Sequence, residues 1–130
     1  MALTLQVDVV AGGARDAAYA VLDVRAPAGA VLPPHVPAHQ DGAVLVLEGR
    51  VEVALAELRR AIGPGGALAL PRGVPRRLTV LEDARLIALT APAGPERLAA
   101  LLHPPAPDHD DVAAHLAAVG VALLPAGWGA

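Results

Sequence analysis

Short apolar or alternating stretches separated by turn signals fill the first two thirds of this sequence. Side chains that alternate between apolar and polar are typical of half-buried strands, and short apolar runs are typical of core strands. On this basis we predict strands at residues 3–10, 17–25, 30–32, 43–48, 67–70, 76–81 and 84–91. The expected breaks are Ala11-Gly12-Gly13, Pro33-Pro34, Gly49 and the Pro71-Arg72-Gly73 turn.

Residues 50–62 allow two interpretations. Their Ala, Leu, Glu and Arg content favours a helix, whereas the alternation of Val51, Val53 and Leu55 with polar or small neighbours favours a strand. We predict a strand pair with a turn near Ala56-Glu57.

The last third of the chain has a different pattern. Pro95 in the sequence GPERLAALL is typical of a helix start, and Pro104 and the prolines after it would end that helix. Asp108 or Asp110 can cap a second helix that runs to Val119 and stops at Gly120. The final VALLP predicts a short strand or an extended arm. These patterns predict an all-β domain with two short C-terminal helices.

Composition excludes several functional classes. The 130 residues suit one domain, with a barrel core at about 17–92 and a helical tail at about 94–120. A net charge of −3 with one Tyr, one Trp and no Phe is a poor match for a nucleic-acid surface. No apolar run is long enough for a membrane helix, and the N-terminus lacks the basic start of a signal peptide. The absence of Cys fits the cytoplasm, where we expect this protein.

Two stretches have glycines and prolines at regular intervals. In the first, GAVLPPHVPAHQDGAVLVLEG, Gly29 is followed by His35, Pro37, Gly42 and Gly49. In the second, GGALALPRGVPRRLTV, Gly65 is followed by Pro71, Gly73, Arg76 and Val80. Glycine and proline at fixed places constrain backbone shape, so these stretches say more about fold than about chemistry.

With these spacings the chain resembles the cupin superfamily, in its small single-domain, cupin 2 conserved-barrel form. The segments VLEGRVEV and LPRGVPRR are similar to the sequences that cupins usually have at these two motifs. The tail from TAPAGPERL is similar to that of small bacterial cupins labelled quercetin 2,3-dioxygenase-like. The resemblance covers residues 17–130. It implies a cupin-type β-barrel, or jelly roll, and a homodimer in which the apolar N-terminal strand could pair across the interface.

The resemblance also implies a divalent metal held by two His and one Glu of the first motif and one His of the second. At these four positions the present chain has His35, Pro37, Gly42 and Arg76. One imidazole cannot hold a metal that needs three or four ligands, and a guanidinium does not give up its proton. We therefore expect neither a metal nor another cofactor.

Neighbouring residues could form a metal site in place of the missing ligands. Along a regular strand, residues 35, 37, 39 and 41 share one face, so His35, His39 and Asp41 could converge on a metal. The family pattern argues against this, because its carboxylate corresponds to Gly42 and Asp41 should face the other way. His39 is also open to a simpler interpretation as an exposed loop residue.

Arg76 inherits a position that points into the barrel. It could bend outward or pair with an acid such as Glu48 or Asp41. Alternatively it could replace the metal as the positive centre of the barrel and bind a carboxylate or phosphate. The candidate ligand-binding residues are therefore His35, Arg76, His39 and Asp41, and no catalytic residue is assigned.

Three functions remain open at this point. The first is a metal-free barrel that binds a small anionic organic molecule. The second is an enzyme, either a metal-dependent quercetinase-like dioxygenase or a metal-free isomerase or cyclase with His35 as general base. The third is an interaction module with a filled barrel and no pocket. The sequence does not decide between enzyme and binder.

Overall fold

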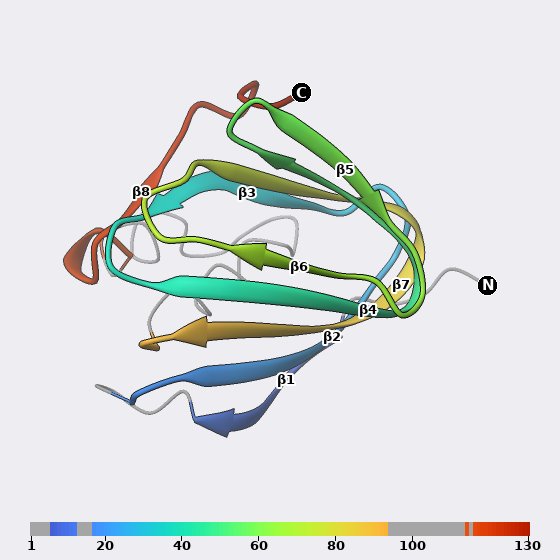
Figure 1. Cartoon of the computed structure of the whole chain (residues 1–130), viewed down its shortest axis with the longest axis horizontal. Coiled ribbons are helices and arrows are strands. Elements are labelled where there is room, and N and C mark those ends of the chain that lie inside the picture. Colours follow the sequence, from blue (N-terminus) through green and yellow to red (C-terminus); the bar gives the residue numbers. More distant parts are fainter. Residues whose placement is uncertain (1–5, 13–16, 94–113, 115) are drawn as a thin grey trace.

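The computed structural model describes residues 6–12, 17–93, 114 and 116–130. These residues contain eight β-strands (Figure 1). The strands are β1 (Gln6–Gly12), β2 (Ala20–Ala26), β3 (Val31–Pro37), β4 (Asp41–Leu55), β5 (Leu58–Ile62), β6 (Ala67–Leu70), β7 (Arg76–Ala91) and β8 (Val121–Leu123). The strand pairs among the described residues are antiparallel. The predicted all-β class is confirmed.

The two longest strands, β4 and β7, hold the two halves of the barrel together (Figure 1). The first part of β4 lies between β6 and the second part of β7, and β2 and then β1 continue that half. The last part of β4 lies between β5 and the first part of β7, followed by β3 and β8. The halves face each other, and the hydrophobic core fills the space between them.

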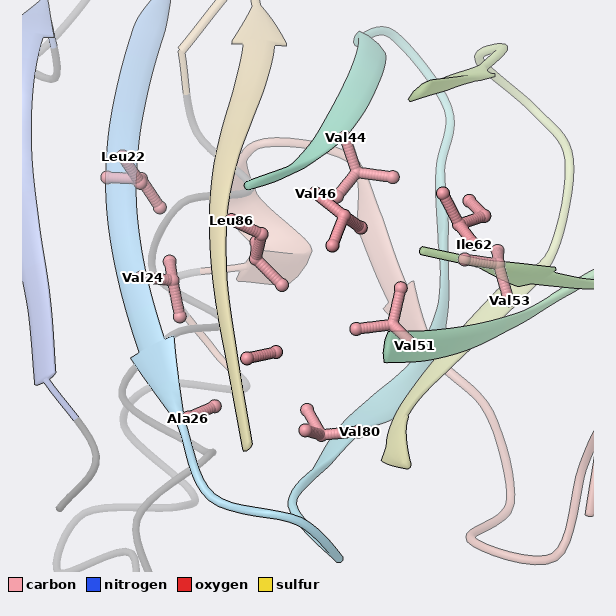
Figure 2. Packing of buried hydrophobic residues seen from close by; sticks show 11 residues of the cluster. Leu22, Val24, Ala26, Val44, Val46, Val51, Val53, Ile62, Val80 and Leu86 are labelled. Carbon is pink, nitrogen blue, oxygen red and sulfur yellow. The ribbon is translucent and has the colours of Figure 1, made fainter. Parts of the chain in front are cut away.

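The core consists of small aliphatic side chains, as expected for a chain without Phe. Figure 2 shows how side chains of both halves point into this shared interior. Its buried members are Leu22, Val24, Ala26, Val44, Val46, Val51, Val53, Ile62, Val80, Ala84 and Leu86. Burying each of the larger ones contributes about 1.5–3 kcal/mol relative to exposure, so this cluster is the main source of stability.

Gly49 is where β4 bends from one half into the other. The β4–β7 register shifts between Val46 and Val51, and Gly49 has a φ of 77°. A Cβ at Gly49 would lie 2.1 Å from the carbonyl oxygen of Asp83. The prediction that Gly49 ends the strand was therefore wrong, because the glycine permits a bulge through which the strand continues. Because β4 and β7 stay paired on both sides of this bulge, the two strands predicted at 76–81 and 84–91 are one strand, β7.

The prolines in β3 also fail to end a strand. β3 runs to Pro37, and Pro33-Pro34 lies in the register shift between Leu32 and His35. Proline lacks the N–H that a regular ladder needs, so it is tolerated at such an irregularity. The turn predicted to begin at Ala11 was also wrong, since β1 extends to Gly12, and Gly13 lies outside the described residues.

Other local predictions are confirmed. The turn at Ala56-Glu57 joins β4 to β5, and Ala56 has a φ of 52°. Residues 114 and 116–118 are helical, Gly120 follows with a φ of 84°, and β8 is the predicted final strand. The first predicted helix lies outside the described residues. In the described part of the chain, no helix is long and apolar enough to cross a membrane.

β1 is an edge strand, and within the described residues it pairs only with β2. Val9 and Val10 on it are 57% and 61% exposed. An edge of this kind can pair with another chain. The homodimer expected from the sequence stays a prediction, which light scattering of the purified protein would test.

Candidate functional site

A cavity of about 110 Å³ lies inside the barrel. Most of its wall is aliphatic, with contributions from Leu22, Val24, Leu32, Val44, Val53, Leu70, Leu78, Val80, Leu86 and Ala88. The polar side chains among its lining residues are His35, Gln40, Asp41, Arg76, Arg77 and Thr90. A mostly apolar cavity with a few polar groups is the usual form of a small-molecule site. The alternative of a filled barrel without a pocket is therefore wrong for this structure.

His35 is a buried cavity residue, 3% exposed, on β3. Its Nδ1 lies 2.9 Å from the carbonyl oxygen of Pro33, which can only accept, so Nδ1 is the protonated ring nitrogen. Burial lowers the pKa of His35 to about 4, the bond to Pro33 opposes this, and the charge of Arg76 lowers it further. At neutral pH the ring is uncharged and its Nε2 is a hydrogen-bond acceptor.

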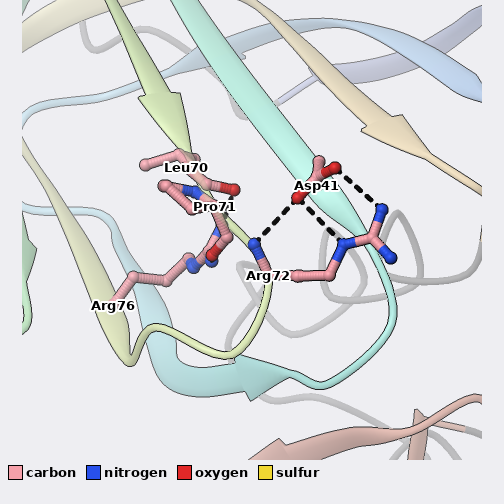
Figure 3. Close-up of polar contacts among 5 residues, drawn as sticks. All are labelled: Asp41, Leu70, Pro71, Arg72 and Arg76. Atoms are coloured by element: carbon pink, nitrogen blue, oxygen red, sulfur yellow. Dashed lines mark hydrogen bonds and ion pairs between the residues drawn. The ribbon is translucent and has the colours of Figure 1, made fainter.

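Arg76 faces His35 across the pairing of β3 and β7 and is 4% exposed. Its guanidinium donates to main-chain carbonyls of the turn between β6 and β7 (Figure 3). Nε and Nη2 donate to Val74 at 3.2 and 3.1 Å, Nη1 donates to Leu70 at 3.0 Å, and Nη2 also donates to Pro71. Burial lowers the pKa of Arg76 to about 10, an effect that the charge of Asp41 opposes, so the side chain remains a cation at neutral pH.

These contacts correct the sequence-based interpretation of Arg76. The side chain neither bends outward nor forms an ion pair with Glu48 or Asp41, because backbone carbonyls of its own turn are closer partners. A guanidinium has five N–H groups, and the four bonds to carbonyls use all of them except one of the two on Nη1.

Gly42 lies close to that nitrogen. A Cβ built on Gly42 would lie 3.6 Å from Nη1 of Arg76, with the carbonyl oxygen of Leu89 at 3.2 Å. Gly42 also lines the cavity. The absence of a side chain at this position is thus what leaves the Arg76 guanidinium facing the interior rather than a protein carboxylate.

Asp41 is on the outer side of the same turn, where it pairs with Arg72 (Figure 3). Its carboxylate accepts from the main-chain N–H of Arg72 at 3.0 Å and from Nε and Nη2 of that residue at 3.2 and 2.9 Å. These hydrogen bonds lower the pKa of Asp41 to about 2. Both side chains are more than half exposed, so this pair closes the turn from the solvent side.

Gln40 is a cavity residue that the sequence analysis missed. It is 3% exposed, and its Nε2 donates to the carbonyl oxygen of Val119 at 2.7 Å. That bond fixes the orientation of the amide, and Oε1 is buried without a hydrogen-bond partner. The position of Gln40 within the first motif, directly before Asp41, was the available signal.

The four predicted site residues therefore separate into two groups. His35 and Arg76 are buried and adjacent, and Asp41 lines the cavity with its carboxylate held by Arg72. His39 is exposed, is not among the cavity residues, and lies against Gly120. In the described ranges, no three His, Cys, Asp or Glu side chains gather closely enough to hold a metal ion.

Several solved structures resemble this fold. KdgF from Halomonas sp. is 29% identical, with a TM-score of 0.62 over 68% of this chain and 79% of that chain. A cupin-2 domain protein from Shewanella frigidimarina is 20% identical, with a TM-score of 0.55 over 65% and 78%. The Cnp3 cupin domain of Schizosaccharomyces pombe is 24% identical, with a TM-score of 0.57 over 73% and 72%.

The sequence itself matches no protein-family model, and a search of curated proteins gave no match. The structural likeness is therefore what places the chain among known folds. The strand arrangement and these similar structures together show that the protein has the all-β cupin fold.

Proposed function

We propose that this barrel binds a small organic anion in its cavity without a metal ion. The observation that supports this most directly is the Arg76 guanidinium, a buried cation next to the cavity that donates to neutral carbonyls. A buried charge without an opposite charge is costly, so an entering anion would gain more from Arg76 than from an exposed arginine.

The residues at the family's metal-ligand positions do not fit a metal. Pro37 and Gly42 have no donor atom, and Arg76 adds a fixed positive charge that would repel a cation. Asp41 is engaged by Arg72, and His39 is exposed outside the cavity. These facts support a metal-free barrel over a metal-dependent dioxygenase.

The chemistry of His35 favours binding over proton transfer. A general base is most effective when its pKa lies near the working pH, and the pKa of His35 lies at about 4. A base this weak is a poor match for the isomerase or cyclase alternative, whereas a neutral imidazole is a good hydrogen-bond acceptor.

The volume of the cavity limits the size of the ligand. An apolar cavity of roughly 150 Å³ accepts benzene in another protein, so a cavity of about 110 Å³ suits a molecule of about five or six non-hydrogen atoms. The aliphatic wall further favours a molecule with an apolar body and one charged end.

A charged side chain placed at Gly42 tests the proposal. NMR titration of the purified protein with propionate and with its neutral amide, propionamide, should show tighter binding of propionate. In Gly42→Glu the new carboxylate lies beside Arg76, so propionate binding should fall by more than tenfold.

Leu45→Glu is the matched control, because Leu45 lies on the same strand but is 38% exposed outside the core. It adds the same charge and should bind propionate as the unmodified protein does. Equal affinity for propionate and propionamide, or a stoichiometric transition metal in the purified protein, would contradict the proposal.

A further inference from the structure

Two residues of the cavity wall have a hydrogen-bond acceptor that their own bonds leave over. Oε1 of Gln40 is buried without a hydrogen-bond partner, and Nε2 of His35 is the ring nitrogen that the bond from Nδ1 to Pro33 leaves as an acceptor. Buried acceptors are normally satisfied, and leaving one unpaired is unfavourable. The unpaired Oε1 of Gln40 therefore favours a ligand that brings a hydrogen-bond donor.

The acceptor role of each atom follows from its partner. His35 uses its ring N–H on the carbonyl of Pro33, which leaves the lone pair of Nε2. Gln40 uses its amide N–H on the carbonyl of Val119, which leaves Oε1. A flipped amide or the other tautomer would put two acceptors against each other, so neither acceptor can become a donor without losing its present bond.

The donor that satisfies these atoms must be neutral. An ammonium group would enter a cavity that already holds the cationic Arg76, and like charges in a low-dielectric interior repel strongly. The one carboxylate in the wall, that of Asp41, is already paired with Arg72 and offers little compensation. A hydroxyl group meets the requirement, because it donates without a charge.

These observations extend the proposed function, on which the inference rests. We infer that the ligand is a small hydroxycarboxylate, whose carboxylate lies toward the remaining N–H of Arg76 and whose hydroxyl donates to His35 or Gln40. The aliphatic wall contacts its carbon atoms. An anion without a hydroxyl would use the cation but leave both acceptors unsatisfied.

The test compares three probes of nearly the same size. Lactate has the carboxylate and the hydroxyl, propionate has only the carboxylate, and lactamide has the hydroxyl without the charge. We expect lactate to bind about tenfold more tightly than propionate, the effect of one net hydrogen bond. NMR titration of the methyl signals of cavity residues measures all three affinities on the same protein.

Removing the acceptors tests the assignment of the hydroxyl partner. The variants are Gln40→Leu and His35→Leu. In at least one of them, the ratio of the lactate affinity to the propionate affinity should fall toward one, while propionate still binds. Two variants are used because either one could lose stability, and the backbone amide spectrum shows which of them is folded.

The outcomes separate this inference from the proposed function. If lactate and propionate bind equally and both bind better than lactamide, the anion site stands and the hydroxyl inference is overturned. If lactamide binds as well as lactate, or if none of the probes binds, the proposed function fails as well. A lactate preference that both folded variants retain also overturns the assignment.

Discussion

Arg72 lies on the turn between β6 and β7, and Arg76 begins β7 four residues later, yet the two side chains have opposite environments. Arg72 is exposed and pairs with the carboxylate of Asp41. Arg76 is buried and donates to the carbonyls of the turn itself. The outer arginine has a charged partner that water screens, whereas the inner one is buried and donates only to carbonyl dipoles. Position across the barrel wall, not residue type, therefore decides which arginine can attract a ligand.

The first motif repeats this contrast with histidines. His35 is buried in the cavity wall, and His39, also four residues later, is exposed. Burial and the nearby Arg76 charge lower the pKa of His35 to about 4. In each motif, two like residues four positions apart thus have opposite environments, one buried and one exposed.

The largest expected effect comes from removing the inner arginine. Arg76→Leu would leave the carbonyls of Leu70, Pro71 and Val74 without their donors, and we expect a loss of about 4 kcal/mol in the free energy of unfolding. Urea unfolding followed by the fluorescence of Trp128 measures it.

The matched variant is Arg72→Leu, which should shift the urea midpoint far less, because the Arg72–Asp41 pair is exposed. Equal losses in the two variants would mean that the carbonyl contacts of Arg76 add nothing beyond an ordinary surface pair.

The next effect is a dependence of stability on pH that His35 causes. The unfolded imidazole binds a proton as the pH falls through 6.5, whereas the folded one does so only near pH 4. The stability that His35 retains above pH 6.5 should therefore be lost progressively between pH 6.5 and 4, by about 3 kcal/mol in total.

Urea unfolding at several pH values in this range measures that slope. His35→Gln should flatten it, and substitution of the exposed His39 by Gln should leave it in place. A slope that persists in His35→Gln would show that another group, such as a carboxylate, is responsible.

The smallest effect links the outer pair to the inner cation. The charge of Asp41 raises the pKa of Arg76, so it also offsets part of the potential that an anion meets in the cavity. Asp41→Asn should strengthen propionate binding about two- to threefold, the size expected of one screened charge. Titration at low and at high salt should show the gain shrinking as salt rises, and weaker binding in Asp41→Asn would contradict this view.

The sequence predicted most elements where hydrophobic alternation is local. The strand at 67–70, the turn at Ala56-Glu57 and the final strand were all correct. It failed at Pro33-Pro34 and at Gly49, where a break in the local pattern is a bulge within a longer strand. Whether such a residue ends a strand or bends it depends on a partner strand far away in the sequence.

What the sequence determined alone is the all-β class and the places of His35 and Arg76 within two motifs that resemble those of cupins, whereas it left open whether Arg76 points inward. Only the tertiary structure decided what these residues contact. The carbonyl partners of Arg76, the bond from Asp41 to Arg72 and the unpaired amide oxygen of Gln40 depend on distances between separate elements. A sequence pattern predicts which side of a strand a residue occupies, but the hydrogen-bond partner of a buried polar group is set by the packing around it.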